Sequence, residues 1–217
     1  MKRNQTRRLT LAAMMGAVSF VLMYFSFSVP VLSPFASFDL SALPDLIGGF
    51  VLGPVGAVEI IAVKVLLKLV FKGTSSMFTG EIQKFLLCTA YALPAVLYYQ
   101  KHRTKRGAAV GLLLGSVAGV IVAILTNVFL IFPAYMALYG MDWAAIVQMC
   151  TAVNPWITNV PTMVAFSIVP FNVISFGVTS ILAMLLFMLN THSITDILRR
   201  GGLGELLALV FIPICLA

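Results

Sequence analysis

The sequence predicts an all-α polytopic membrane protein with six transmembrane helices, because of its composition, its long apolar runs and the placement of its basic residues. Apolar side chains make up 61% of the 217 residues and charged side chains 10%, with a mean hydropathy of +1.06. Soluble domains average about 45–50% apolar and 25% charged residues, so this chain lacks the side chains for a water-facing surface. The composition excludes a soluble globular enzyme and a disordered chain, and it indicates a protein whose solvent is lipid.

The basic residues predict the orientation of the chain. The sequence has 14 Lys and Arg against 7 Asp and Glu, a net charge of +7. Most of the basic residues fall into three clusters, at residues 2–8, 101–106 and 199–200. Each cluster borders a long apolar run, as the cytoplasmic loops of membrane proteins do, so we expect no nucleic-acid partner. The pattern is typical of a multi-pass protein of the cell membrane with a cytoplasmic N-terminus.

Five apolar runs are long enough to cross a bilayer, at about 20 residues for each crossing. They cover residues 9–29, 44–71, 79–99, 107–133 and 158–189. Five crossings would put basic clusters on opposite sides of the membrane. The run 44–71 contains Gly53-Pro54, and a proline interrupts a helix because it lacks an N–H and clashes with the preceding turn. We therefore expect two short helices, near 40–53 and 54–72, which gives six spans and places every basic cluster inside.

Two long connections are rich in apolar and aromatic residues, at 30–43 and 134–157. We expect them to form lids or walls of an outward-facing pocket, although an aromatic belt lying in the interface is the alternative. Residues 1–200 are expected to form a single domain. The apolar tail 201–217 is marginal as a further span, and we expect an interfacial segment or an extension outside the domain.

The sequence carries no recognisable catalytic motif. It lacks the G-x-x-x-x-G-K-[ST] loop of ATP-binding proteins, the H-E-x-x-H zinc motif and the G-x-S-x-G nucleophile motif. Its three cysteines, Cys88, Cys150 and Cys215, have no metal-ligand spacing. We therefore expect neither an enzyme, nor a metal site, nor a cofactor.

Two amides inside apolar runs are candidates for ligand binding. Asn127 and Asn172 each lie within a predicted span, where a polar side chain is costly unless it has a partner or serves a site. An amide offers two donors and an acceptor, which suits a neutral heterocycle with carbonyls and ring nitrogens. Hydrogen bonding between helices is the equally weighted alternative.

Lysines in the predicted third helix require partners. Their spacing of four residues places three of them on one helix face, namely Lys64, Lys68 and Lys72. Lys64 is the deepest, and Glu59 and Glu81 are the partners that we expect for it. Glu81 and Lys84 are three residues apart, so they are also expected to pair with each other.

Small residues form two ridges of the kind that lets helices approach closely. Ala13 and Ala17 make an A-x-x-x-A ridge beside the basic N-terminus, and we interpret it as a partner surface. Gly111, Gly115 and Gly119 make a double G-x-x-x-G ridge, for which packing within the chain is the favoured interpretation.

Four stretches carry a resemblance to a known family. They are FASFDLSALPDLIGGFVLGPVGAVEIIAVKVLLKLVFKGTSS, TGEIQKFL, LTNVFLIFPAYMALYGM and VPFNVISF. Together with six predicted helices and A-x-x-x-A on the first, they resemble the substrate-binding S-components of energy-coupling factor (ECF) vitamin transporters. The riboflavin-specific S-component is the most similar member of that group.

The resemblance implies a function and its partners. It implies a high-affinity riboflavin-binding subunit of an ECF-type ABC transporter, with riboflavin as transported ligand rather than cofactor. Ala13 and Ala17 would contact a transmembrane coupling subunit, which joins two ATPase subunits. The alternatives are an S-component for a different vitamin or precursor, and a stand-alone secondary transporter with Glu59 as its one candidate coupling carboxylate.

The resemblance also implies a set of substrate-binding residues. Asn127 and Asn172 would hydrogen-bond the flavin ring system, and the loop around Asp39 to Leu43, which includes Leu40, would form part of the pocket. The family motif G-E-x-x-N-F supplies Glu81 but has Lys84 in place of its asparagine, and P-F-N-x-I-K-G has Ser175 in place of its lysine. We expect Lys84 to compensate for that missing lysine from another helix.

Overall fold

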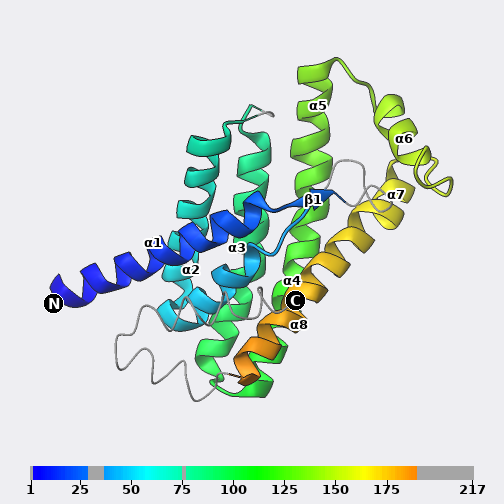
Figure 1. The fold of residues 1–217 in the computed structure, drawn as a ribbon. Coiled ribbons are helices and arrows are strands. Elements are labelled where there is room, and N and C mark those ends of the chain that lie inside the picture. The colour runs from blue at the N-terminus through cyan, green and yellow to red at the C-terminus, as the bar shows by residue number, and fades with distance from the viewer. Residues whose placement is uncertain (1, 29–36, 75–76, 190–217) are drawn as a thin grey trace.

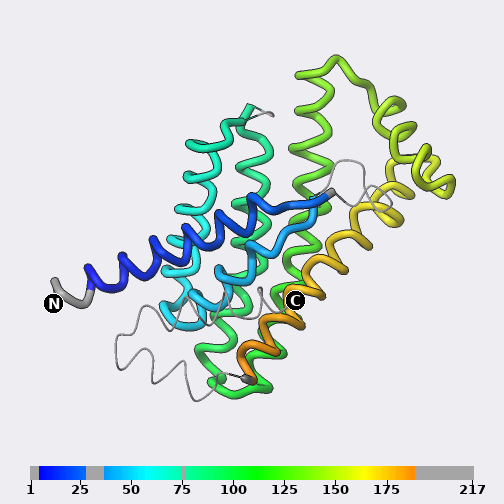
Figure 2. The backbone as a smooth tube through the Cα atoms, in the orientation of Figure 1, coloured from blue at the N-terminus to red at the C-terminus, as the bar shows by residue number. Residues whose placement is uncertain are grey.

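The computed structural model describes residues 2–28, 37–74 and 77–189 as a bundle of helices with one short β-hairpin (Figures 1 and 2). The long elements are α1 (Lys2–Tyr24), α2 (Ala42–Lys72), α3 (Thr79–Lys101), α4 (Lys105–Thr126) and α8 (Val169–Leu189). Shorter ones are β1 (Phe27–Ser28), β2 (Ser37–Phe38), α5 (Phe132–Tyr139), α6 (Trp143–Thr151) and α7 (Val160–Met163). The predicted tail 201–217 and the basic cluster at 199–200 lie outside the described residues.

The helices confirm an all-α membrane protein. Among the described residues, four helical stretches are long and apolar enough to cross a membrane: Gln5–Tyr24, Ala42–Lys72, Lys105–Tyr139 and Val160–Met188. The stretch α3 falls outside this group, and its ends carry Glu81, Lys84 and Gln100. The first helix ends at Tyr24 rather than at the predicted residue 29, because Phe27 and Ser28 pair with Phe38 and Ser37 as antiparallel strands.

Helix α2 turns back on itself at the predicted break. Gly53 has φ 86°, a conformation that residues with a Cβ rarely adopt, and Pro54 follows it. Asp45 in the first half forms an ion pair with Lys64 in the second, although 19 residues of straight helix would span about 28 Å. The two halves therefore run antiparallel as a helical hairpin, as the tube in Figure 2 shows.

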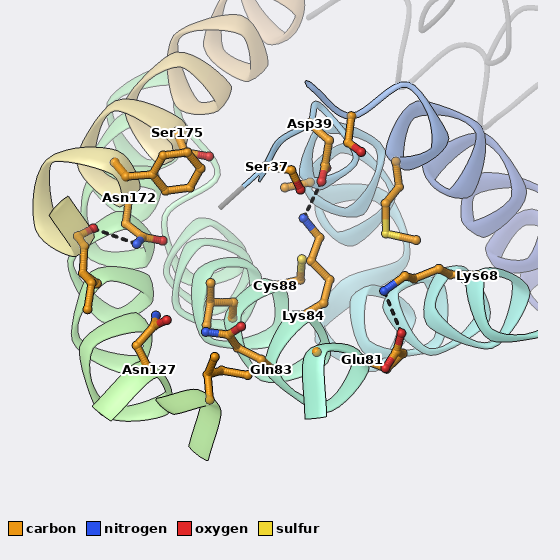
Figure 3. A pocket seen from close by; sticks show the side chains of 18 of the residues that line it. Ser37, Asp39, Lys68, Glu81, Gln83, Lys84, Cys88, Asn127, Asn172 and Ser175 are labelled. Atoms are coloured by element: carbon orange, nitrogen blue, oxygen red, sulfur yellow. Dashed lines mark hydrogen bonds and ion pairs between the residues drawn. The ribbon is translucent and has the colours of Figure 1, made fainter. Parts of the chain in front are cut away.

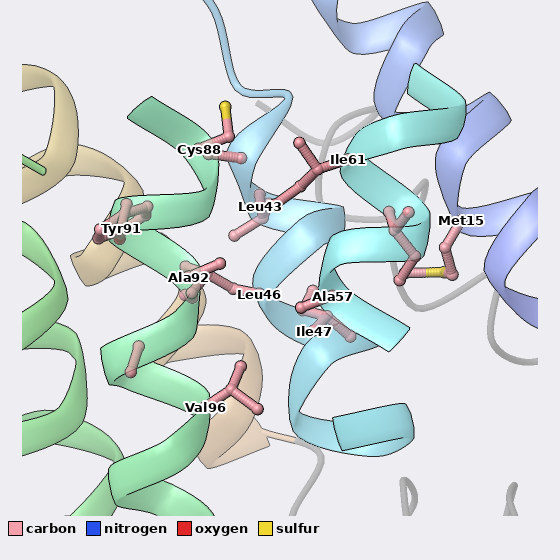
Figure 4. Close-up of a cluster of buried hydrophobic side chains, with 14 of the residues drawn as sticks. Met15, Leu43, Leu46, Ile47, Ala57, Ile61, Cys88, Tyr91, Ala92 and Val96 are labelled. Carbon is pink, nitrogen blue, oxygen red and sulfur yellow. The ribbon is translucent and has the colours of Figure 1, made fainter. Parts of the chain in front are cut away.

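The core of the bundle lies between this hairpin, α1 and α3 (Figure 4). Close packing of the hairpin depends on its glycines: a Cβ built on Gly49 would lie 3.0 Å from the Ala57 Cβ. Leu46 and Ile61 are fully buried there. In a bilayer, close packing of such side chains holds helices together through van der Waals contact.

The glycine ridge of α4 packs against α3. A Cβ on Gly111 would meet the Ala95 carbonyl oxygen at 2.7 Å, and one on Gly115 would meet the Tyr91 carbonyl oxygen at 2.2 Å. These helices can approach so closely only because the ridge lacks side chains. The interpretation of this ridge as packing within the chain is confirmed.

Two short π-helical segments widen the second half of the bundle. They are η1 (Asn127–Ile131), between α4 and α5, and η2 (Val164–Ile168), between α7 and α8. Each ends two residues before a proline, Pro133 or Pro170. A proline removes one helical hydrogen bond and crowds the preceding turn, and the wider π turn accommodates it.

The two ends of the bundle differ. In Figure 1 the basic connection between α3 and α4 lies at the bottom, whereas α5, α6 and α7 lie at the top. Helix α1 crosses the bundle obliquely, with its N-terminus at the left. The elements at the top and the β-hairpin surround the site described next.

Candidate functional site

A cavity of about 470 Å³ opens among α1, the α2 hairpin, α3, η1 and α8, and the basic residues 101–106 do not line it. Small-molecule sites commonly have volumes of about 300–1,000 Å³. The predicted connection 30–43 contributes Ser37, Asp39 and Ala42 to its lining, and the connection 134–157 contributes Tyr135 and Cys150. The prediction that these connections wall a pocket is confirmed for their described residues.

One wall of the cavity carries an ion pair between the loop before α2 and helix α3. Lys84 Nζ donates to Asp39 Oδ2 at 2.6 Å (Figure 3). Asp39 Oδ1 accepts a second hydrogen bond, from the Ser41 backbone N–H at 2.9 Å. Burial disfavours the ionised Asp39 carboxyl, but Lys84 and these hydrogen bonds outweigh burial and lower its pKa below the ordinary value. Lys84 therefore reaches the cavity with its charge already paired.

A second ion pair lies on the same wall. Lys68 Nζ donates to Glu81 Oε1 at 2.7 Å, and the Thr74 hydroxyl donates to Glu81 Oε2 at 3.0 Å. The expected pairing of Glu81 with Lys84 is wrong, because α2 presents Lys68 to Glu81 and the loop before α2 presents Asp39 to Lys84.

The opposite wall carries the two predicted amides. Asn127 opens the π segment η1 and Asn172 lies in the first turn of α8, and both line the cavity together with Ser175 (Figure 3). Asn127 Nδ2 donates to the Ala123 carbonyl oxygen and Asn172 Nδ2 to the Ile168 carbonyl oxygen, each at 2.8 Å. Each amide thus bonds within its own helix, and neither of these two bonds joins helices.

Apolar side chains fill the rest of the lining. Four aromatic rings and two thioethers come from several helices: Phe20, Met23, Phe132, Met163, Phe171 and Phe176. Such a surface favours a flat conjugated ring, because offset stacking and sulfur contacts add to the burial of apolar area. Leu40, a predicted site residue, is half-buried and does not line this cavity.

Sequence reasoning missed the partner of Lys64. The fully buried Lys64 pairs with Asp45, whereas Glu59 lies 3.5 Å from Arg8 and Glu81 pairs with Lys68. The expectation of Glu59 or Glu81 as the partner is wrong, because the turn at Gly53 brings Asp45 across from Lys64. The sequence did contain a signal for this pair, because Asp45 and Lys64 lie on either side of the predicted break at Gly53-Pro54.

Sequence reasoning also missed the π segments. Both adjoin the cavity, through Asn127 and Ile131 in η1 and through Ser167 and Ile168 in η2. Single π turns in helices are frequent at functional sites. Their available signal was a proline inside each of two predicted spans.

The alanine ridge faces outward. Ala13 and Ala17 are exposed on α1, whereas Gly16 packs against Val63 of the α2 hairpin.

Within the described part of the chain, no three His, Cys, Asp or Glu side chains gather in a way that could hold a metal ion. The chemistry available in the cavity is therefore hydrogen bonding, ion pairing and apolar contact.

Comparisons with known proteins agree with this arrangement. A family model described as "ECF transporter, substrate-specific component" matches residues 7–187. The chain is 30% identical over 184 residues to the riboflavin transporter RibU of Staphylococcus aureus (strain TCH60), covering 85% of this chain and 90% of that protein. It is 28% identical over 185 residues to the riboflavin transporter FmnP of Bacillus subtilis (strain 168), covering 85% and 92%.

A solved structure shares the fold. It is described as "Structure and mechanism of the S component of a bacterial ECF transporter" and superposes with a TM-score of 0.66 at 30% sequence identity. The similarity covers 85% of this chain and 95% of that one.

Proposed function

Because the chain belongs to the family of substrate-specific components of ECF transporters, we propose that it is the riboflavin-binding subunit of such a transporter and mediates riboflavin uptake across the cell membrane. The chain is a transporter component and not an enzyme. Riboflavin is its transported ligand rather than a cofactor. The relatives named as riboflavin transporters align over 85% of the chain, and the match to the family model over residues 7–187 includes every residue that lines the cavity.

The observation that carries the proposal is a cavity with two amides on one wall and aromatic side chains around them. The isoalloxazine ring of riboflavin is flat, neutral and edged with carbonyls and ring nitrogens. Asn127 and Asn172 can exchange their local hydrogen bonds for bonds to that edge. Asp39, Glu81, Lys84 and Ser175 complete the polar lining, and in this proposal they contact the ligand or hold the groups that do.

The proposed topology has six crossings, with both halves of α2 and helix α3 counted as spans. The basic residues at 2–8 and 101–106 then lie in the cytoplasm, as does the N-terminus, and the cavity faces the outside. Membrane lipid surrounds the apolar outer faces of the helices. The exposed ridge of Ala13 and Ala17 meets the transmembrane coupling subunit, which joins two ATPase subunits.

Titration with riboflavin tests the proposal. The purified chain is mixed with riboflavin in detergent or nanodiscs, and quenching of the flavin fluorescence reports binding because the ring enters an aromatic-lined site. We expect saturable quenching at one riboflavin per chain. A folded sample that neither quenches flavin fluorescence nor retains yellow flavin from riboflavin-containing medium would contradict the proposal. Parallel titrations with other vitamins then identify a different ligand.

A further inference from the structure

A buried polar cluster lies beside the cavity, where α1, α2 and α3 meet. Lys64, with 0% of its side chain exposed, forms an ion pair with Asp45. Lys64 Nζ also lies 3.3 Å from both Ser41 Oγ and Cys88 Sγ. The Ser19 hydroxyl of α1 lies 2.5 Å from the Ser41 carbonyl oxygen and 2.7 Å from Asp45 Oδ1, so its proton serves these two acceptors. We call these five residues the Lys64 cluster.

Packing alone does not account for the Lys64 cluster. Ionised side chains inside membrane segments are costly and occur mainly where they serve a function. Replacing a buried ion pair with apolar residues of similar volume is often neutral or stabilising. The α2 hairpin is already closed by contacts between Gly49 and Ala57. The fold would therefore tolerate an apolar pair in place of Lys64 and Asp45.

The Lys64 cluster has one end at the cavity and the other at α1. At the cavity, Cys88 lines the wall, and the Ser41 backbone N–H holds the Asp39 carboxylate that pairs with Lys84. At α1, Ser19 is buried two residues after the exposed Ala17. A continuous path of hydrogen bonds thus joins the ion-paired wall of the cavity to the helix that carries the outward alanine ridge.

We propose that the Lys64 cluster transmits ligand occupancy from the cavity to the exposed face of α1, with Lys64 and Asp45 as positioning residues. A ligand that shifts the Lys84–Asp39 pair moves Ser41, and Ser41 moves Ser19 because the two are directly bonded. Lys64 and Asp45 hold this contact in place, because Lys64 donates to the Ser41 hydroxyl and Asp45 accepts from the Ser19 hydroxyl. The inference rests on the proposed function only in taking riboflavin as the ligand.

The test measures α1 and the cavity separately. A single thiol is placed on the outer face as Ala17→Cys, and the full chain in nanodiscs is labelled with a membrane-permeant maleimide, because position 17 lies within the α1 span, with and without saturating riboflavin. The chain without this substitution gives the background from its own cysteines. We expect riboflavin to change the labelling rate at position 17 by at least about fivefold, the lower end of ordinary coupling between two sites.

The decisive variant is Lys64→Met combined with Asp45→Leu. It should bind riboflavin with an affinity within about threefold of the parent, and its labelling rate should no longer respond to riboflavin. Ser19→Ala, which removes only the α1 end of the Lys64 cluster, should give the same loss and serves if the double variant does not fold. Ser180→Ala is the matched control, because Ser180 bonds Tyr91 and Ser116 in a partly buried group that does not include α1.

The outcomes separate the two proposals. A riboflavin response that persists in Ser19→Ala and in the folded double variant overturns the linkage. A parent chain that binds riboflavin but shows no labelling response overturns it as well. Absence of riboflavin binding by the parent chain instead contradicts the proposed function.

Discussion

The two walls of the cavity are built on different principles. On the wall from α3 and the segments beside it, Lys84 and Lys68 are each committed to a carboxylate, Asp39 or Glu81. On the wall from η1 and α8, Asn127 and Asn172 bond carbonyls of their own helices. An ion pair loses much of its energy when one partner is drawn away, whereas a local amide bond exchanges for a ligand bond at little net cost. We therefore expect the first wall to hold the site together and the second wall to contact the ligand.

The largest expected effect is a loss of stability when the buried ion pair between Lys64 and Asp45 is broken. Lys64→Met leaves the buried Asp45 carboxylate without its ion-pair partner, and breaking such a pair costs about 3–5 kcal/mol of stability. Thermal unfolding in detergent measures the loss. Arg8→Met is the matched control at the half-exposed contact with Glu59, where we expect a change below about 1 kcal/mol. Equal losses in the two variants would contradict the structural role of the buried pair.

The next effect tests recognition by the amides. Asn127→Ala or Asn172→Ala should weaken riboflavin binding by about 1–3 kcal/mol, because a buried polar group of the ligand loses its partner. Fluorescence quenching gives the dissociation constants. Asn154→Ala, outside the cavity, should leave the affinity unchanged. If both cavity variants bind like the parent chain, recognition lies elsewhere and the contrast between the walls is lost.

A smaller effect tests whether Lys84 replaces the family lysine that is Ser175 here. Lys84→Asn should weaken riboflavin binding by about 1 kcal/mol, since it removes a charged group from the ion-paired wall. Ser175→Lys in the same chain should restore part of that loss from the amide wall. Isothermal or fluorescence titration of the three chains decides the matter, and an affinity that neither substitution alters would refute the compensation.

The pH dependence of binding should be smaller still. The lowered pKa of Asp39 means that its pairing with Lys84 contributes fully above the ordinary value of 3.8 and is lost only as the pH falls through the lowered value. Riboflavin affinity should therefore stay flat from about pH 5 to 8. A decline within that range, measured by quenching, would mean that another group titrates at the cavity.

The smallest effect on the cavity comes from α1. Ala13→Trp enlarges an exposed side chain on the outer face, so riboflavin affinity should remain unchanged. Association with the coupling subunit should be lost, because a bulky side chain prevents close helix approach. Co-purification with the coupling subunit and the two ATPase subunits measures this association. If the Ala13→Trp variant assembles normally, the alanine ridge is not part of the interface with the coupling subunit.

What could be predicted from the sequence depended on local chemistry. The break at Gly53-Pro54 followed from the conformations open to those two residues, and the structure confirms it. The presence of Asn127 and Asn172 in one cavity followed from the cost of amides in apolar helices. The ridge of Gly111 and Gly115 could be interpreted because close packing needs small residues.

The contacts that could not be predicted join residues far apart in the sequence, and they depend on how the helices and loops are arranged in space. The partner of Lys64 was assigned wrongly because the pairing with Asp45 requires the angle at which the hairpin closes. Lys84 was assigned to Glu81 by spacing along one helix, whereas the loop before α2 brings Asp39 within 2.6 Å. The π segments depend on how the chain relieves the crowding at Pro133 and Pro170, which spacing alone does not specify.

The hairpin in α2 has a consequence for how the protein enters the bilayer during synthesis. Inserted singly, its two halves would carry Asp45, in the first turn of α2, and Lys64 as bare charges, and a bare charge costs up to about 2.5–3.5 kcal/mol at the centre of a helix. Inserted together, they neutralise each other before meeting hydrocarbon. Entry into lipid as a closed hairpin avoids this cost, so we expect the turn at Gly53 to form before the two halves enter lipid.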